Sequence, residues 1–331
     1  MVIWFNHWFS AAYHFIDMLK GAGYYVIASN YSDECIYKTN ADEFFKEPSC
    51  SYSKYVDWCI DFCEKHDVKV FFPWRNMDLI VNNLNKFEEI GVNVVCEKDI
   101  EMFNTFKRKS TTLDFFKRHN ICDVSEYRII SNKETFAKAY FEMEKYEDIC
   151  VKYDKDEGGD SFKKILRKEK EPNMHRMRER PELGLSLPYM LDCLKTVDKC
   201  NNIIMMPYLE GPEISIDCIG FNNELLAIPR YKLNERVTKI DMDEKVINIA
   251  KRFYEVARLE GPFNIQLRYH DGKLFVLEVN TRLSGGCWKN KFIGCEFPVI
   301  CVQKFSKTLS VLPSVTQKEL IIANVENAII L

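Results

Sequence analysis

The fold is decided by the stretch Leu277-Glu278-Val279-Asn280-Thr281-Arg282-Leu283-Ser284-Gly285-Gly286, which follows Asn264-Ile265-Gln266 along the chain. Both stretches contain alternating apolar and polar residues, a pattern that predicts β-strands. Glu278 and Asn280 are two residues apart, so both point to the same face of their strand. Carboxylate and amide oxygens are hard ligands that suit Mg²⁺. The longer stretch therefore predicts a strand that ends in a magnesium site.

The turn between the two strands decides whether Gln266 joins that site. A two-residue loop at Asp271-Gly272 would place Gln266 on the same face as Leu277, whereas a three-residue loop would place it with Glu278. We predict the three-residue loop, and with it a metal site made of Gln266, Glu278 and Asn280. The alternative interpretation is a buried polar cluster whose members only satisfy one another.

A second informative stretch is Ile149-Cys150-Val151-Lys152-Tyr153, an apolar strand with a lysine near its end, followed by Gly158 and Gly159. The lysine supplies a point charge, and the glycines allow backbone N–H groups to approach phosphate oxygens. The pattern predicts a polyphosphate site. A solvated lysine at the end of a strand is the alternative interpretation.

A third stretch runs from Met205 to Asp217 as an apolar strand, a turn and an alternating strand, in which Glu213, Ser215 and Asp217 share one face. A purine needs backbone N–H and C=O groups in an apolar slot, and a ribose needs a carboxylate acceptor. This stretch offers both, with Glu213 as the acceptor. The alternative is an ordinary half-exposed strand.

The first hundred residues contain short apolar segments that alternate with segments of helical periodicity. Strands are predicted at Val2–Phe5, Tyr24–Ala28, Lys69–Phe72 and Val92–Val95, and one continuous helix is predicted from Met77 to Phe87. This alternation favours a parallel sheet with helices on both faces. The dinucleotide glycine fingerprint is missing from the first turn, which argues against a nicotinamide site. Further along, the charged segment Lys163–Arg180 is expected to be an exposed excursion, either a lid over the site or a solvated loop.

Composition narrows the class of protein. The chain has 331 residues, of which 47% are hydrophobic and 29% charged, and its net charge is −3. These values exclude a disordered chain and give no basic footprint for nucleic acid. No run of 18 apolar residues occurs and no secretory signal is evident, so neither a membrane span nor secretion is expected. The thirteen cysteines include no CxxC pair, which favours reduced thiols and a cytoplasmic location.

Taken in chain order, these stretches resemble the ATP-grasp superfamily, and most closely its carbamoyl-phosphate synthase large subunit and biotin carboxylase type. The family pattern of a Gln strand followed by Glu-x-Asn-x-Arg is matched by Gln266, Glu278, Asn280 and Arg282. Two departures stand out. The glycine loop reads Gly-Gly-Asp-Ser-Phe where the family commonly has Gly-Gly-x-Gly, and the final motif reads Asn-Thr-Arg instead of Asn-Pro-Arg.

The resemblance implies a chain of the α/β and α+β classes with the ATP-grasp fold. Its expected parts are a Rossmann-like pre-ATP-grasp domain with a parallel sheet over residues 1–104, an N-terminal ATP-grasp subdomain over 105–204 and a C-terminal subdomain over 205–331. ATP would lie between the two subdomains.

The resemblance also implies roles for individual residues. Lys109, at the start of a helix, is the first phosphate-binding lysine, with Lys107 or Arg108 as alternatives, and Lys152 is the second. The remaining nucleotide contacts fall on Gly158, Gly159, Met206, Tyr208, Leu209 and Glu213. Mg²⁺, or Mn²⁺ in its place, would be held by Gln266, Glu278 and Asn280. Arg282 and Arg230 would be catalytic residues that face phosphate or substrate.

The implied activity is that of an ATP- and magnesium-dependent ligase. It would convert a small carboxylate, such as an amino acid or a peptide, into an acyl-phosphate that an amine attacks, forming a C–N bond. The alternatives are a nucleotide-binding regulatory protein and a phosphotransferase on the same fold. The expected partners are ATP and small substrates, with a homodimer by analogy, and neither nucleic acid nor a membrane.

Overall fold

The computed structural model describes residues 1–155, 161–166, 184–196, 200, 202–325 and 328–330. The chain divides into two compact units, which are described separately. Unit 1 consists of Met1–Asn104, Ile214–Ile265 and Asn280–Leu331, and unit 2 consists of Thr105–Glu213 and Gln266–Val279. The three-part division expected from the sequence stays a prediction.

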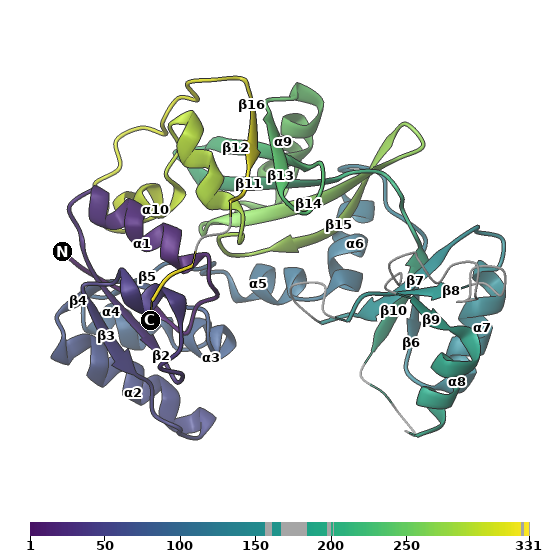
Figure 1. Cartoon of the computed structure of the whole chain (residues 1–331), viewed down its shortest axis with the longest axis horizontal. Helices are drawn as coiled ribbons and strands as arrows, with labels where there is room; N and C mark the ends of the chain where they lie inside the picture. The colour runs from purple at the N-terminus through teal and green to yellow at the C-terminus, as the bar shows by residue number, and fades with distance from the viewer. Residues whose placement is uncertain (156–160, 167–183, 197–199, 201, 326–327, 331) are drawn as a thin grey trace. The chain divides into compact units, whose positions relative to one another are not determined.

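The N-terminal part of unit 1 is a five-stranded parallel sheet with the strand order β3-β2-β1-β4-β5 (Figure 1). Its strands are β1 (Val2–Asn6), β2 (Tyr25–Asn30), β3 (Glu43–Lys46), β4 (Val68–Phe72) and β5 (Asn93–Val94). The predicted parallel sheet is thus confirmed. Strand β3 was not predicted, because its two apolar residues are adjacent and the segment lacks the alternation that marks a half-buried strand.

Helices cover both faces of this sheet, because successive residues of a strand point in opposite directions. Ile3 and Phe5 belong to a core that includes residues of α1 (Ala12–Gly21) and α10 (Phe297–Phe305). Trp4 points the other way, into a core with α2 (Tyr52–Lys65). The expected covering of both faces is therefore present.

The helix predicted from Met77 to Phe87 is in fact two short helices, α3 (Met77–Val81) and α4 (Leu84–Glu89). At the break, the side-chain amides of Asn82 and Asn83 donate to backbone carbonyls one turn earlier. Asparagine side chains compete in this way with the backbone pattern of a helix, which explains why the apolar periodicity alone gave the wrong length. The segment that follows carries α5 (Ile100–Phe106).

Unit 2 contains a second sheet with the strand order β6-β10-β7-β8-β9. Its strands are β6 (Arg128–Ile130), β7 (Ile149–Tyr153), β8 (Lys163–Leu166), β9 (Gly184–Ser186) and β10 (Ile203–Pro207). Helices α7 (Lys133–Met143) and α8 (Leu187–Lys195) pack on one face, where their apolar residues meet Ile149, Val151 and Met205. The opposite face, to which Lys152 of β7 and Lys164 of β8 point, is free of these helices.

Strand β8 corrects the expectation of a loop at 163–180. Ile165 is buried and pairs with Ile149 of β7, so the two apolar residues at 165–166 continue the sheet despite the charged residues around them. The rest of the charged segment, 167–180, lies outside the described residues.

A third sheet has the strand order β15-β14-β11-β12-β13-β16. Its strands are β11 (Glu213–Phe221), β12 (Glu224–Lys232), β13 (Val237–Asp241), β14 (Phe263–His270), β15 (Lys273–Asn280) and β16 (Glu319–Ala323). Helix α9 (Glu244–Ala257) buries the apolar residues predicted for it, among them Val246 and Phe253, and contacts β12.

The loop between β14 and β15 has two residues, so the predicted three-residue loop is wrong. β14 ends at His270 and β15 begins at Lys273, while Asp271 and Gly272 have φ angles of 47° and 77°. Two successive left-handed residues are typical of a type I′ turn, whose twist matches that of the flanking strands. Asp271 tolerates this conformation, so glycine was needed at only one of the two positions.

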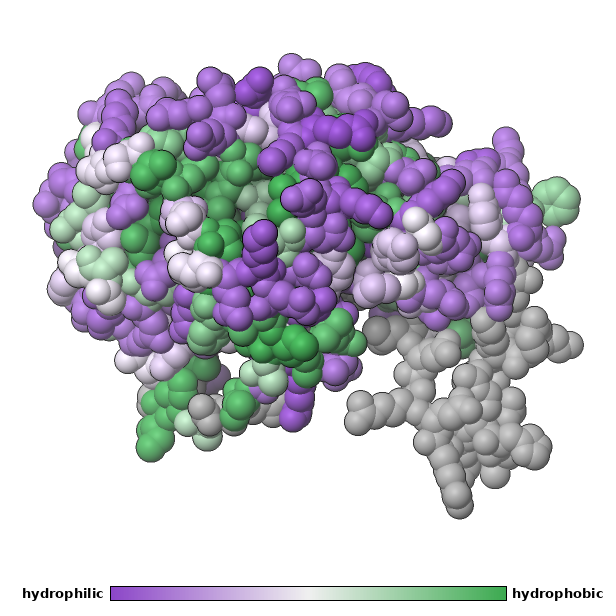
Figure 2. Space-filling view, turned by 90° about the horizontal axis from the view of Figure 1, so that it is seen from above, coloured by the Kyte–Doolittle hydropathy of each residue, from purple (hydrophilic) through white to green (hydrophobic). Residues whose placement is uncertain are grey.

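The face shown in Figure 2 is largely hydrophilic, with hydrophobic residues exposed between polar ones. Within the described part of the chain, no helix is both long and apolar enough to cross a membrane.

Candidate functional site

The helix-free face of the unit 2 sheet carries lysines. In the register of β7, Lys152 pairs with Ile204, and Cys150 pairs with Met206 on one side and Lys164 on the other. Paired residues share a face, and Lys152 and Cys150 are two residues apart, so all five side chains lie on the same face. The predicted phosphate lysine and the predicted adenine-contacting Met206 are therefore brought to one surface.

Lys109 is the first residue of helix α6 (Lys109–Arg118), and Asp154 fixes the start of that helix. The Asp154 carboxylate accepts hydrogen bonds from the backbone N–H of Ser110 at 2.8 Å and from its hydroxyl at 2.9 Å. The backbone N–H of Lys109 donates to the Asp154 carbonyl at 2.9 Å. The Lys109 side chain is buried, and its Nζ lies 3.5 Å from Oε2 of Glu278.

Lys152 belongs to the same electrostatic environment. Burial lowers the pKa of its ammonium group, the Glu278 carboxylate raises that pKa, and Lys109 lowers it further. Lys109, Lys152 and Glu278 come from a helix and two sheets that are far apart in the sequence. The structure thus brings together three of the residues that the sequence singled out.

Two further cations, not predicted from the sequence, join this surface. Arg268 on β14 donates to the Leu209 carbonyl at 3.1 Å and to the Glu213 carboxylate at 3.0 Å. Lys164 lies over the Tyr208 ring, 3.8 Å from its centroid. Arg268 is two residues after Gln266 on the same face of a strand, which is a signal that could have identified it, whereas Lys164 fell in a segment expected to be a loop.

The residues expected to contact adenine lie at the end of β10. Met206 and Leu209 are buried, and the Tyr208 backbone N–H donates to the Asp148 carbonyl at 2.9 Å. The other nucleotide contacts predicted from the sequence, Gly158 and Gly159, lie outside the described residues.

The expected metal ligands are one carboxylate, Glu278, and two amides, Gln266 and Asn280. Gln266 shares a face of β14 with Arg268. The Glu278 carboxylate raises the pKa of Lys152, and the Arg268 guanidinium lowers it. Among the described residues, no group of three or more His, Cys, Asp or Glu could hold a metal ion. A single carboxylate supported by amides fits Mg²⁺, which commonly binds through one or two carboxylates together with substrate phosphates.

The charges on this surface do not balance. Among the described residues, its cations are Lys109, Lys152, Lys164 and Arg268, and the carboxylates placed with them are Glu213 and Glu278. Burial raises the pKa of the Cys150 thiol to about 11, so this residue adds no negative charge near pH 7. The surface therefore has an excess of positive charge, which suits a polyanion.

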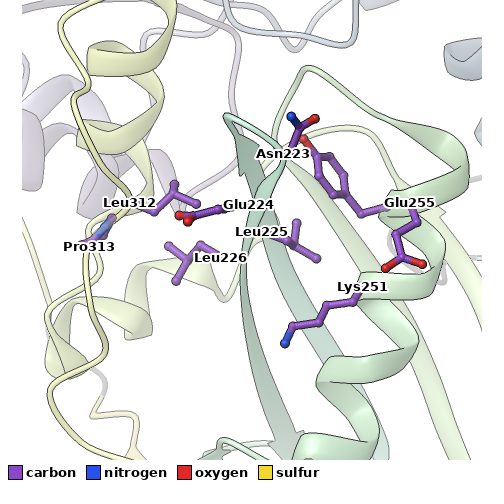
Figure 3. A pocket seen from close by; sticks show the side chains of 9 residues that line it. Asn223, Glu224, Leu225, Leu226, Lys251, Glu255, Leu312 and Pro313 are labelled. Carbon is purple, nitrogen blue, oxygen red and sulfur yellow. The ribbon is translucent and has the colours of Figure 1, made fainter.

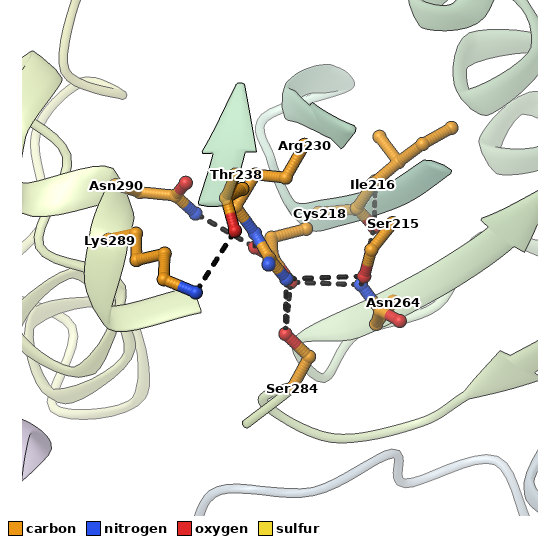
Figure 4. Close-up of polar contacts among 10 residues, drawn as sticks. Ser215, Ile216, Cys218, Arg230, Thr238, Asn264, Ser284, Lys289 and Asn290 are labelled. Atoms are coloured by element: carbon orange, nitrogen blue, oxygen red, sulfur yellow. Dashed lines mark hydrogen bonds and ion pairs between the residues drawn. The ribbon is translucent and has the colours of Figure 1, made fainter. Parts of the chain in front are cut away.

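Unit 1 contains a second polar cluster, centred on the buried ion pair of Arg230 and Asp217 (Figure 4). Nε of Arg230 lies 2.6 Å from the Asp217 carboxylate, and Nη2 donates to the hydroxyl of Ser284 at 2.7 Å. Side-chain amides of Asn264 and Asn290 also donate to Asp217, each at 2.9 Å. The expected contact of Arg230 with phosphate or substrate stays a prediction, and its partner Asp217 was not predicted from the sequence.

Lys289 and Gly286 lie next to this cluster and leave little space around the Arg230 guanidinium. Lys289 is buried and donates to the Thr238 hydroxyl at 3.1 Å, and its burial beside Arg230 lowers the pKa of its ammonium group to about 8. A Cβ atom on Gly286 would lie 2.2 Å from Nη1 of Arg230, so the backbone there approaches the guanidinium more closely than any side chain allows.

Arg282, the last residue of the Glu-x-Asn-x-Arg pattern, lies over the face of Trp74, 4.2 Å from the ring centroid. This contact lies within unit 1 and connects the pattern to the loop that follows β4. An arginine over an indole ring is a cation–π arrangement that holds the guanidinium in place.

Comparison with known proteins gives matches in both sequence and structure. Residues 199–328 match a family model described as ATP-grasp in the biosynthetic pathway with Ter operon. The carbamoyl phosphate synthase large chain of Clostridium botulinum is 30% identical over 115 residues. That match covers 30% of this chain and only 11% of the relative, so the chain spans about a tenth of that protein's length.

Solved structures resemble the chain over nearly all of its length. An ADP complex of the N5-carboxyaminoimidazole ribonucleotide synthetase purK has a TM-score of 0.72 and 12% identity, covering 98% of this chain and 81% of that one. An L-amino acid ligase from Bacillus licheniformis has a TM-score of 0.63 and 11% identity, covering 93% and 76%. The fold is therefore the ATP-grasp fold, and residues 199–328 match a family model of ATP-grasp proteins.

Proposed function

We propose that this ATP-grasp chain binds ATP on the cationic face of unit 2 and uses it to join a small carboxylate to an amine. In the proposed reaction, an oxygen of the carboxylate attacks the γ-phosphorus, and the bond to the β-γ bridging oxygen breaks to release ADP. An amine then attacks the acyl-phosphate carbon, phosphate leaves, and the amine loses a proton. The products are an amide, ADP and phosphate.

The observation that carries the proposal is the meeting of Lys109, Lys152 and Glu278. Fixed ammonium groups near transferring phosphoryl oxygens stabilise charge that develops in the transition state, and no covalent nucleophile from the protein is required. Met206, Tyr208 and Leu209 would line the adenine, and Glu213, held by Arg268, would accept from the ribose.

Mg²⁺, when bound, would neutralise phosphate charge, with oxygens supplied by Glu278 and Asn280. The two-residue loop removes the register argument for Gln266, so its role as a third ligand rests on the family resemblance alone. Arg282, and Arg230 with it, would face the phosphate or the acyl-phosphate. The preference for an amino acid or peptide is supported by the resemblance in fold to an L-amino acid ligase.

Glu278→Ala and Asn280→Ala, tested singly, should abolish magnesium-dependent ATP turnover, with a loss of at least about 10²-fold. Circular dichroism should show an intact fold for both. Turnover is measured as ADP release with pools of carboxylates and amines, and products are identified by mass spectrometry. Glu255→Ala, which changes an exposed glutamate of α9, is the matched control and should keep the parent rate.

The outcomes separate the rival functions. Turnover at the parent rate in either variant would refute the metal assignment. A stable phosphorylated product without an amide would select a phosphotransferase, and tight nucleotide binding without turnover in any pool would select a regulatory nucleotide-binding protein.

A further inference from the structure

The carboxyl ends of the N-terminal parallel strands carry a cluster of polar residues that the nucleotide site does not use. In the order β3-β2-β1-β4-β5, the chain runs outward from β1 to β2 and β3, then crosses to β4 on the other side of β1 and continues to β5. Ligands of open α/β sheets bind outside the carboxyl ends of the strands at such a switch point. The residues found there are His7 after β1, Tyr31 after β2, Glu47 after β3 and Arg75 after β4.

Glu47 is the fixed part of this cluster. Its side chain is 0% exposed, and its carboxylate accepts from the hydroxyls of Ser29 at 2.9 Å and Tyr55 at 3.1 Å. Nη1 of Arg75 donates to the same carboxylate at 3.1 Å. A carboxylate that is buried and held by three donors is an anchor for the arginine and is not itself accessible to a ligand.

Arg75 is held in one orientation but still reaches solvent. Its guanidinium lies 5.2 Å from the ring centroids of both Tyr31 and Tyr55, and its side chain is 24% exposed. Two rings and one ion pair fix the plane of the fork, so little conformational freedom would be lost when it binds a planar anion. A guanidinium in a fixed plane matches a carboxylate, which it can bind through two parallel hydrogen bonds.

His7 contacts the same tyrosine ring as this arginine. Its ring stacks on Tyr31, with centroids 4.3 Å apart and planes at 15°, and its backbone φ is 40°. Left-handed backbone at a non-glycine residue is uncommon and often occurs at functional sites. Nδ1 of His7 is buried and makes no hydrogen bond with any described residue, so a polar group remains to be satisfied there.

The cluster also adjoins a residue of the nucleotide pattern. Trp74 precedes Arg75, its backbone N–H donates to Asn6 at 2.6 Å, and its ring carries the guanidinium of Arg282. All of these contacts lie within unit 1. Trp74 is thus next to Arg75 in the sequence and in contact with Arg282 in space. A carboxylate bound at Arg75 would therefore be connected to the proposed phosphate-facing Arg282 through one aromatic residue.

A hollow elsewhere in unit 1 serves as a contrast to this cluster. It has a volume of about 440 Å³ and lies between β12, α9 and residues 312–313 (Figure 3). Its charged lining consists of Lys251 with Glu224 and Glu255, an excess of negative charge that disfavours an anion.

We propose that Arg75, fixed by Glu47 and the two tyrosines, binds the carboxylate group of a substrate of the ligase. This inference rests on the proposed function and adds a binding residue to it. Two sources of the carboxylate share this chemistry: the acid that is to be activated, and the α-carboxylate of an amino acid that acts as the amine.

The test is a binding measurement that does not require turnover. Saturation-transfer difference NMR is recorded with the full-length protein, MgADP and a panel of the proteinogenic L-amino acids, acetate, propionate and succinate. Compounds that bind the parent protein should bind Arg75→Met and Arg75→Lys at least about tenfold more weakly, because lysine keeps the charge but loses the fork. Lys38→Met, which removes an exposed cation over the Phe44 ring of the same domain, should bind like the parent.

The two sources of the carboxylate are distinguished by testing each compound that binds again as its amide, in which the carboxylate is replaced by a neutral carboxamide. If the amino-acid amide fails to bind but is still accepted as the amine at high concentration, Arg75 holds the α-carboxylate of the nucleophile. If the amide is neither bound nor turned over, Arg75 holds the acid that is activated.

The proposal is overturned if no compound of the panel binds the parent protein, or if Arg75→Met binds with unchanged affinity. Its failure is distinct from that of the ligase function. Binding that depends on Arg75, without ADP release in any mixture, would leave this site standing and refute the ligase. ADP release unchanged by Arg75→Met and Arg75→Lys would do the opposite.

Discussion

The two charged clusters of this molecule are built in opposite ways. Around Asp217, one guanidinium and one carboxylate meet at 2.6 Å, and neighbouring amides and hydroxyls complete the hydrogen bonds. Around Glu278, Nζ of Lys109 lies 3.5 Å from the carboxylate, and Lys152 is a second ammonium group beside it. The first cluster holds its central ion pair in direct contact without a ligand, although Lys289 lies beside it, whereas the cations of the second are held less closely by its carboxylates. A short and fully hydrogen-bonded ion pair therefore distinguishes a cluster that stabilises the fold from one that binds.

The largest effect is expected when the first cluster loses its carboxylate. Asp217→Asn keeps the shape but leaves Arg230 buried without its counter-charge, which should lower the free energy of unfolding by about 3–5 kcal/mol. Urea unfolding followed by circular dichroism measures this. The matched control is Asp33→Asn, which breaks an exposed pair with Lys46 and should cost about 1 kcal/mol or less. Equal, small effects at both positions would contradict the comparison.

The second prediction concerns the pH dependence of Lys289. Its pKa is lowered to about 8 in the folded protein, so the unfolded chain binds more protons between about pH 8 and pH 10.5. Stability contributed by this group is therefore lowest below pH 8 and rises with pH. A pKa shift of this size lowers the free energy of unfolding at pH 7 by about 3 kcal/mol. A variant without the lysine would recover this free energy but lose the hydrogen bond to Thr238, which contributes about 1 kcal/mol.

Lys289→Met should thus unfold at higher urea concentration than the parent at pH 7, and the gain should vanish at pH 10.5. Lys318→Met, at an exposed position, provides the baseline and should differ little from the parent at either pH. A gain for Lys289→Met that is independent of pH would show that the buried charge is not its origin.

The smallest change in stability is expected in the cationic face of unit 2. Lys109→Met removes one of two neighbouring ammonium groups, so relief of repulsion with Lys152 offsets the lost attraction to Glu278. The free energy of unfolding should therefore change by less than it does for Asp217→Asn, whereas the affinity for MgADP, measured by calorimetry, should fall. A loss of stability as large as that of Asp217→Asn would show that this cluster, too, is structural.

Much of the fold could be predicted because it follows from local pattern. The parallel N-terminal sheet and helix α9 both follow from apolar periodicity. The errors occurred where side chains override that pattern. Asn82 and Asn83 interrupt a helix, and Asp271 adopts a left-handed conformation that shortened the loop between β14 and β15.

The candidate site was predictable to the extent that its residues lie in a recognisable order. Lys109, Lys152 and Glu278 were identified in this way, and the structure brings them together. The partners that tune them were not predicted. Lys164 and the pairing of Asp217 with Arg230 depend on strand register and on contacts between distant segments, which a single sequence does not encode, whereas the spacing of Arg268 from Gln266 was a signal that could have identified it.

One close approach sets a limit on redesign. Because a methyl group at Gly286 would occupy the space of the Arg230 guanidinium, every other amino acid at that position would displace the arginine from Asp217. At Gly285 an added methyl would meet only the edge of the Phe9 ring, at 3.1 Å, which a small rotation relieves. An engineer who wants to alter this loop therefore has more freedom at residue 285 than at residue 286, where any added side chain requires the Arg230 guanidinium to shift.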